Sequence, residues 1–399
     1  MPDAESLKKE VVVEIDSISK KLIEISDWIH ANPEVGHKEF ETSKLLSGEL
    51  ERAGFQVERH VCGLDTAFKA TMRGKAGGST VALLAEMDAL QGIGHGCGHN
   101  IIGTASLGAA LALKKIMPKV NGCLIVFGTP AEEGGVENAG GKVIMVNEIA
   151  KADVAMMVHP DNKTEVECTT VAREAMEFEF FGRAAHAAGE PHEGINALNA
   201  VIHMFTLIDA LRQHVKPDVR MHGIITEGGK APNIVPEYAA AKMYVRAMNR
   251  EYMKEVAEKV KKCAEGAALA TGAKMKVRDY ANTLENMITN HALAEAMRNN
   301  WEKIGVKVQE PEEEGSGSTD MGNVSQVVPS IHAYIEIGPR GMPSHSIEFV
   351  KAAASEEGHR GLINAAKGLA MTSIDIFTNP ELLGKIRQEF KEFKEKGKG

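Results

Sequence analysis

Cysteine is scarce in this 399-residue chain, and its distribution argues against a structure held together by disulfides. The five cysteines are Cys62, Cys97, Cys123, Cys168 and Cys263, an odd number with irregular spacing. A reducing compartment would leave Cys97 free to act as a metal ligand.

Long apolar runs and an excess of positive charge are also missing. No stretch approaches the roughly 20 apolar residues of a membrane-spanning helix. Residues 1–16 are acidic and amphipathic and contain no apolar signal core. The net charge of −9 disfavours nucleic acid as a partner. We therefore expect a cytoplasmic protein with neither a membrane nor a nucleic-acid partner.

The composition is ordinary for a soluble globular protein, with 43% hydrophobic and 25% charged residues. The length exceeds what one hydrophobic core usually supports, so we expect two domains. Continuous apolar runs at residues 81–86, 123–127 and 154–158 predict strands buried on both faces of a sheet. Helical patterns separate these runs, which indicates an α/β fold with a largely parallel sheet.

From residue 172 the predicted elements follow a different order: strand, helix, strand, strand, helix, strand. That order is typical of a ferredoxin-like α+β unit. We expect a catalytic domain that begins at residues 1–172 and resumes at residues 282–399, with the second domain inserted at residues 173–281. The predicted last elements are one long helix at residues 354–379 and, from residue 385, a charged, solvated helix that frays.

The turn at residues 94–100 (GHGCGHN) holds Cys97 and His99 among three glycines, between a predicted strand and a predicted helix. Glycine allows the backbone to approach a bound atom closely, and thiol and imidazole are ligands of transition metals. The pair alone fits equally a small buried cysteine in a tight turn.

Further side chains of ligand type, Asp88, Glu133 and His159, lie at or just past the ends of predicted strands. Ligands of such sheets gather beyond the carboxyl ends of the strands, so we expect these residues to meet. His345, in a C-terminal loop, could complete a metal site or be an ordinary surface histidine.

The adjacent carboxylates of Glu132 and Glu133 should raise each other's pKa, and a nearby cation would relieve that repulsion. One carboxylate could bind a metal while the other takes a proton from water that the metal acidifies. The pair would also suit the N-terminus of a helix. Asp88 could orient a metal ligand or serve as a turn residue.

The predicted inserted domain contains three candidate substrate contacts. His186 lies among alanines, Asn233 follows a proline, and Arg246 ends a strand, where it could clamp a carboxylate. Taken alone, these residues slightly favour a solvent-facing histidine and a surface salt bridge.

Six motifs occur in the order found in M20-type metallopeptidases. They are residues 87–90 (MDAL), 96–100 (GCGHN), 131–135 (AEEGG), 159–160 (HP), 185–188 (AHAA) and 344–346 (SHS). The chain most resembles the cysteine-ligand branch of amidohydrolases, dipeptidases and aminoacylases. Residues 92–95 (GIGH) and 317–325 (GSTDMGNVS) are similar to the group around M20 domain-containing protein 2 and p-aminobenzoyl-glutamate hydrolase.

This resemblance implies a zinc-peptidase-like catalytic domain with a mixed, mostly parallel sheet and an inserted lid domain that forms a homodimer. It also implies two divalent metal ions, zinc or manganese. The implied metal ligands are Cys97, His99, Glu133, His159 and His345, with Cys97 as the bridge.

The resemblance assigns the remaining roles as well. Glu132 would be the general base and Asp88 an orienting residue, while His186 would stabilise the oxyanion in the partner subunit's site. Asn233 and Arg246 would contact the substrate. The chain departs from the family's pattern at two positions, with Gln91 in place of proline and Asn100 in place of aspartate. We expect Asn100 to change the charge near the metals.

The leading hypothesis is a metal-dependent amidohydrolase that cleaves the amide of a dipeptide or an N-acyl amino acid. Two alternatives stay open. One is a cysteine hydrolase with Cys97 as nucleophile and His99 as base, and the other is a metal-binding or ligand-binding protein without catalysis.

Overall fold

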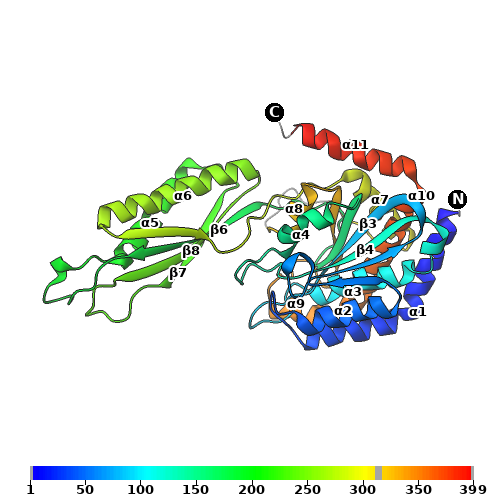
Figure 1. Ribbon diagram of the computed structural model, residues 1–399, viewed down its shortest axis with the longest axis horizontal. Helices are drawn as coiled ribbons and strands as arrows, with labels where there is room; N and C mark the ends of the chain where they lie inside the picture. The colour runs from blue at the N-terminus through cyan, green and yellow to red at the C-terminus, as the bar shows by residue number, and fades with distance from the viewer. Residues whose placement is uncertain (1–2, 311–316, 397–399) are drawn as a thin grey trace. The chain divides into compact units, whose positions relative to one another are not determined.

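A computed structural model describes residues 3–310 and 317–396 (Figure 1). The chain divides into two compact units. We call residues 3–169, 287–310 and 319–396 the catalytic unit, and residues 170–286 with 317–318 the inserted unit. The sequence had placed these boundaries near residues 173 and 281. Positions 397–399 of the predicted tail lie outside the described residues.

A six-stranded sheet with the order β1-β2-β4-β3-β5-β10 forms the centre of the catalytic unit. Its strands are β1 (Gln56–Arg59), β2 (Phe68–Arg73), β3 (Lys75–Glu86), β4 (Asn121–Thr129), β5 (Val154–Asp161) and β10 (Ser330–Glu336). Strands β4, β3, β5 and β10 run parallel to one another, whereas β2 pairs antiparallel with both β1 and β4. The predicted mixed, mostly parallel sheet is confirmed.

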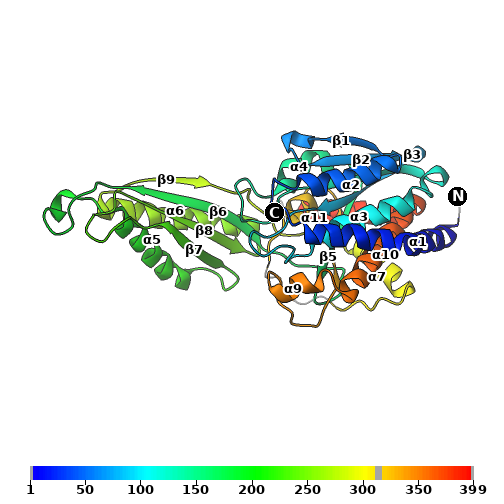
Figure 2. The ribbon, with the colours of Figure 1, turned by 90° about the horizontal axis from the view of Figure 1, so that it is seen from below.

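Helices cover both faces of this sheet (Figures 1 and 2). One face carries α1 (Ala4–Ala31), α2 (Phe40–Arg52), α3 (His99–Leu113), α7 (His291–Lys303) and α10 (Glu356–Thr378), and the other carries α4 (Gly141–Ile149) and α8 (Met321–Ser325). Alternate residues of β3 enter opposite cores: Val81 and Leu83 face the first helix layer, and Ala82 and Leu84 face the second. The apolar run is continuous because both faces are buried.

The C-terminal part differs from the prediction in two ways. A short helix α9 (Ile347–Ala352) precedes α10, and the side chain of Ser355 caps α10 by accepting a hydrogen bond from the Gly358 amide. The tail forms a separate helix, α11 (Pro380–Lys396), whose Ile386 is fully buried against the catalytic unit. The tail was predicted as a solvated helix. The helix is present, but one side of it is not solvated, because Ile386 is buried and Leu382 and Leu383 pack against the same core.

The inserted unit contains an antiparallel sheet with the order β7-β8-β6-β9 (Figure 1). Its elements are β6 (Ala172–Phe181), α5 (Ala197–Leu211), β7 (Arg220–Glu227), β8 (Tyr238–Ala247), α6 (Arg250–Thr271) and β9 (Lys274–Asp279). Both helices pack on one face of the sheet around a core of their own. The predicted ferredoxin-like unit is confirmed. Among the residues that the structure describes, no helix is long and apolar enough to cross a membrane.

Helices α7 and α10 pack closely where Trp301 lies against Gly368. Trp301 is fully buried, its indole N–H donates to the Asn364 carbonyl at 2.9 Å, and a Cβ at Gly368 would lie 2.3 Å from the indole nitrogen. We expect Gly368→Ala to lower the free energy of unfolding by about 1–3 kcal/mol, because the ring has no space to move.

Urea unfolding followed by tryptophan fluorescence measures this effect, since both tryptophans, Trp28 and Trp301, lie in the catalytic unit. The control is Gly48→Ala in α2, where the new methyl group meets only the flexible end of Arg52 at 3.4 Å. That variant should be neutral or slightly stabilising, within about 1 kcal/mol. Equal losses in both variants would contradict the packing argument.

Candidate active site

The side chains expected to meet at the strand ends do lie together. Glu86 is the last residue of β3 and Asp88 follows it by two positions, while Glu132 and Glu133 follow the end of β4. Strand β5 continues to Asp161, so His159 lies inside the strand rather than past its end. The sequence had ended this strand too early because the apolar run stops at Val158.

The glycine-rich turn brings the thiol and the imidazole to this edge. Gly98 adopts φ +69° and precedes His99, which is the first residue of α3. A Cβ on Gly98 would lie 2.5 Å from Pro160, so the turn requires glycine both for its conformation and for its contact with β5.

Four of the five predicted metal ligands form a close cluster. The ligand atoms of Cys97, His99 and Glu133 lie within 4.8 Å of one another, and the same limit joins those of Glu86, His99 and His159. His159 directs Nδ1 to the Pro160 carbonyl at 2.7 Å, which leaves its Nε2 available.

The fifth predicted ligand, His345, arrives from the loop before α9. Its Nε2 lies 3.9 Å from a Glu133 oxygen, and its backbone N–H donates to the Gly96 carbonyl at 3.0 Å. The structure therefore brings together residues from four separate segments of the chain.

Asp88 connects three parts of this site. One carboxylate oxygen lies 3.2 Å from His99 Nδ1 and accepts the Glu132 backbone N–H at 3.2 Å, and the other accepts the Glu133 N–H at 3.0 Å. The contact with Nδ1 leaves Nε2 of His99 facing Glu86 at 3.3 Å and Glu133 at 3.8 Å. A carboxylate in such contacts could orient a metal ligand, and the orienting role of Asp88 stays a prediction.

The donor set fits a metal ion. Three buried atoms, Oε2 of Glu86, Nε2 of His99 and Oε1 of Glu133, form no hydrogen bond with the described residues, and the contacts between them are ion-pair distances of 3.3 and 3.8 Å. Buried polar atoms normally have partners, so these three indicate a position for a cation. Thiolate, imidazole and carboxylate together suit zinc and also permit manganese.

Glu132 lies in a strongly acidic surrounding. Burial, followed by the charges of Glu86 and Glu133, raises the pKa of Glu132 well above its ordinary value. One oxygen each of Glu86, Glu132 and Asp320 lies within 4.8 Å of the others. A carboxylate with a raised pKa at the edge of a metal cluster is suited to accept a proton.

Lys142 is a buried cation that the sequence pattern did not identify. Its Nζ lies 2.5 Å from a Glu86 oxygen and also binds Asp320, whose other oxygen accepts the Lys142 backbone N–H at 2.8 Å. Burial opposes ionisation of Glu86, but Lys142 and His99 outweigh it and lower the pKa of Glu86 to about 2. The available signal was one lysine in the otherwise apolar start of a short helix.

Two histidines near the site have other neighbours. His95 is buried and stacks on His30, with ring centroids 6.2 Å apart, and burial lowers the pKa of His95 to about 3. His332, also unpredicted, is buried with its ring 5.5 Å from that of His159. Neither belongs to the clusters of possible metal ligands found among the described residues.

Asn100 has a packing role. Its amide nitrogen donates to Ser26 Oγ at 2.9 Å and to the Ala353 carbonyl at 3.0 Å, and the side chain is fully buried. These contacts join α3 to α1 and to the end of α9. The expected effect of Asn100 on the charge near the metals stays a prediction.

The predicted substrate contacts belong to the inserted unit. His186 Nδ1 accepts the backbone N–H groups of Ala188 and Gly189, and the Ala187 N–H donates to the Asn233 carbonyl at 3.0 Å. His186 and Asn233 are therefore close neighbours, and both are exposed.

Arg246, in β8, donates to Ser318 Oγ at 2.9 Å and to His222 at 3.3 Å. The salt bridge considered for Arg246 from the sequence stays a prediction.

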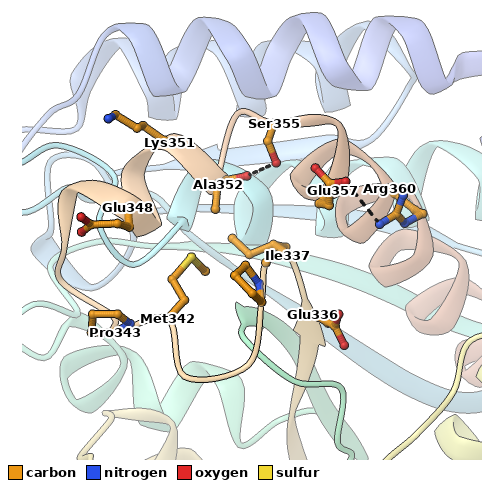
Figure 3. A pocket seen from close by; sticks show the side chains of 12 residues that line it. Glu336, Ile337, Met342, Pro343, Glu348, Lys351, Ala352, Ser355, Glu357 and Arg360 are labelled. Carbon is orange, nitrogen blue, oxygen red and sulfur yellow. Dashed lines mark hydrogen bonds and ion pairs between the residues drawn. The ribbon is translucent and has the colours of Figure 1, made fainter.

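A separate cavity of 670 Å³ lies beside the loop that leads to His345 (Figure 3). Apolar side chains of Ile337 and Met342 lie at its centre. The charged residues around it are Glu336, Glu348, Lys351, Glu357 and Arg360. None of the predicted catalytic residues or ligands lines this cavity.

Comparison with known proteins agrees with this geometry. The model of peptidase family M20/M25/M40 matches residues 82–367. The Xaa-Arg dipeptidase of Mus musculus is 36% identical over 98% of this chain and 93% of its own length. The chain belongs to the M20 peptidase family. It is thus a hydrolase, and the resemblance inferred from its motifs is confirmed at the level of the family.

One further relative agrees with this chain in length, and a solved structure agrees with it in fold. A p-aminobenzoyl-glutamate hydrolase chain of Escherichia coli (strain K12) is 29% identical over 94% of this chain and 93% of its own length. A dinuclear metal-binding M20 peptidase from Bacillus subtilis has the same fold, with a TM-score of 0.66, 19% identity and coverage of 91% of this chain and 99% of that one.

The protonation states of the proposed metal ligands predict how metal binding should depend on pH. The charges of Glu86 and Asp88 outweigh burial and raise the pKa of His99 to about 10 in the metal-free protein, while burial raises the pKa of the Cys97 thiol. Both ligands therefore carry protons at pH 7 and must lose them to bind. We expect zinc binding to release about two protons and to strengthen as pH rises from about 6 to about 8.

Calorimetric titration of zinc into the metal-free protein, in buffers of different ionisation enthalpy, counts these protons. Cys97→Ala should release about one proton fewer, whereas Cys123→Ala, which removes a thiol in β4, should match the wild type. Metal binding without proton release would show that the cluster is already deprotonated.

Proposed function

We propose that this M20 hydrolase is a metal-dependent dipeptidase with Glu132 as its general base. The observation that carries the proposal is the position of Glu132. It is adjacent in sequence to the proposed ligand Glu133, its backbone is held by Asp88, and its carboxylate lies close to Glu86. A carrier protein would have no need for a base at this point.

In this proposal two divalent ions, zinc or manganese, are held by Cys97, His99, Glu133, His159 and His345. When bound, they would polarise the amide carbonyl and acidify water.

Glu132 takes a proton from the attacking water as the oxygen bonds to the carbonyl carbon. It then gives that proton to the leaving nitrogen as the carbon–nitrogen bond breaks. The products are a carboxylic acid and an amine, with no other reactant consumed.

The substrate class is inferred from the relatives. The Xaa-Arg dipeptidases of Mus musculus and Homo sapiens are 36% and 35% identical to this chain. We propose dipeptides with a free C-terminal carboxylate as substrates, and those ending in arginine should be tested first. N-acyl amino acids carry the same amide and carboxylate and form the second class. In the proposed complex, Asn233 and Arg246 bind the substrate and His186 stabilises the oxyanion in the partner's site.

The cysteine-hydrolase alternative has less support. Burial raises the pKa of Cys97 and so disfavours the thiolate nucleophile. His99, the proposed base of that mechanism, has its ring nitrogens directed to Asp88, Glu86 and Glu133.

Replacing the base should separate catalysis from metal binding. We expect Glu132→Gln to lower kcat by about 10²–10⁴-fold, because the proton transfer is lost. It should retain both metals, whereas Glu133→Gln should lose metal. Turnover of a dipeptide panel, together with metal analysis of each purified variant, measures both effects. Full activity in Glu132→Gln, or in chelator-treated protein shown to be metal-free, would contradict the proposal.

We also propose that the inserted unit forms a homodimer through the free edge of β7. Both outer strands of its sheet have a free edge, but their side chains differ. Strand β9 carries Lys274, Lys276 and Arg278, and such charges discourage pairing with another strand. Strand β7 instead exposes Ile224 and Ile225, at 64% and 45%. A second copy of the chain would cover this apolar edge.

The two edges supply matched variants for a test of this dimer. Light scattering should give the wild type twice the 43.0-kDa chain mass. Ile224→Lys should halve that mass by placing a charge on the β7 edge. Val277→Lys on β9 should leave it unchanged. A wild-type monomer, or a dimer in both variants, would reject this interface.

A further inference from the structure

The segment between α1 and α2 contacts both loops that carry the active site. We call residues 33–39 the bracket. The Glu34 carbonyl accepts the Ala89 N–H at 2.7 Å, one residue after Asp88. A carboxylate oxygen of Glu39 accepts the Ala131 N–H at 2.8 Å, one residue before Glu132.

The side chain of Glu39 does not cap the helix at whose start it lies. It occupies the N-cap position of α2 but makes no cap hydrogen bond there. The carboxylate of Glu34 instead accepts the helix N–H groups of Glu41 at 3.1 Å and Thr42 at 2.8 Å. The carboxylate of Glu39 is thereby free to bind a distant part of the chain.

Glu39 is fully buried, and both oxygens of its carboxylate accept hydrogen bonds. It accepts the backbone N–H groups of Ala131 and His37, the latter at 3.0 Å, and the hydroxyl of Thr66 at 2.7 Å. No lysine, arginine or histidine among the described residues forms an ion pair with it. Burying an unpaired carboxylate is costly, so its position requires a reason beyond packing.

That reason is the conformation of Ala131. This residue adopts φ +55°, the left-handed region that costs an alanine about 1–2 kcal/mol. Gly36 of the bracket lies against it so closely that a Cβ there would be 3.0 Å from the Ala131 Cα. Asp88 accepts the next two N–H groups, those of Glu132 and Glu133. Two carboxylates thus hold three successive amides.

We propose that Glu39 is a positioning residue that keeps Ala131 left-handed and so directs the Glu132 side chain toward the substrate. The inference rests on the proposed role of Glu132 as general base. Among the described residues, the Glu39 carboxylate forms no hydrogen bond or ion pair with a proposed metal ligand, and in this proposal it acts through the backbone of Ala131.

Three variants separate positioning from charge and from simple loss of packing. Glu39→Ala removes the acceptor, so kcat should fall about 10–100-fold while KM and metal content stay near the wild-type values. Glu39→Gln keeps an oxygen for the Ala131 N–H and should retain kcat within about threefold. Adding Ala131→Gly to Glu39→Ala should restore about fivefold in kcat, because glycine adopts the left-handed conformation readily.

The matched control is Glu49→Ala, which removes another buried carboxylate of α2 together with its ion pairs to Lys21 and Arg52. It should leave kcat unchanged. The proposal is overturned if Glu39→Ala keeps wild-type kcat, if Glu39→Gln loses as much as Glu39→Ala, or if Glu49→Ala is equally impaired.

Hydrogen exchange of the metal-free protein provides a test that does not depend on activity. In Glu39→Ala the amides of Ala131, Glu132 and Glu133 should exchange at least about tenfold faster than in the wild type, and in Glu39→Gln they should not. Faster exchange at Ala131 alone would show a local bond with no effect on the base, and would reject positioning. A wild type that cleaves no dipeptide rejects the proposed function, while these exchange rates still decide the role of Glu39.

Discussion

The active site depends on the contacts that the Asp88 carboxylate makes. With two oxygens it fixes the imidazole of His99 and the backbone of both Glu132 and Glu133. These groups come from separate segments, after β4 and at the start of α3, and would not meet without a shared acceptor. A buried carboxylate that accepts hydrogen bonds with both oxygens sets their positions more strictly than packing could. The reason is that a buried polar group left without a hydrogen-bond partner destabilises the fold.

Charge balance explains why the cluster suits divalent ions. Five carboxylates gather at the strand ends, belonging to Glu86, Asp88, Glu132, Glu133 and Asp320. Among the described residues, Lys142 is the lysine that pairs with this group, and His99 adds a second charge only while it is protonated. The proposed metal ions would supply the missing positive charge and replace the protons that the metal-free ligands retain.

The sequence predicted the sheet and the meeting of its strand ends because continuous apolar runs identify buried strands, and the parallel arrangement brings their ends to one edge. It did not predict the function of Lys142 or Glu39. Lys142 pairs with Asp320, 178 positions away, and Glu39 binds an amide 92 positions away. No local pattern marks such partners. Similarly, the burial of Ile386 in α11 depends on contacts with distant elements rather than on the charged sequence around it.

We propose that the cluster around Asp88 and His99 binds two metal ions. Anomalous diffraction from crystals grown with zinc, recorded on both sides of the zinc absorption edge, tests this most directly. We expect two peaks, both within bonding distance of the Cys97 sulfur, with His99, Glu133, His159 and His345 as the other ligands. Peaks elsewhere, or no ordered metal at this cluster, would contradict the claim.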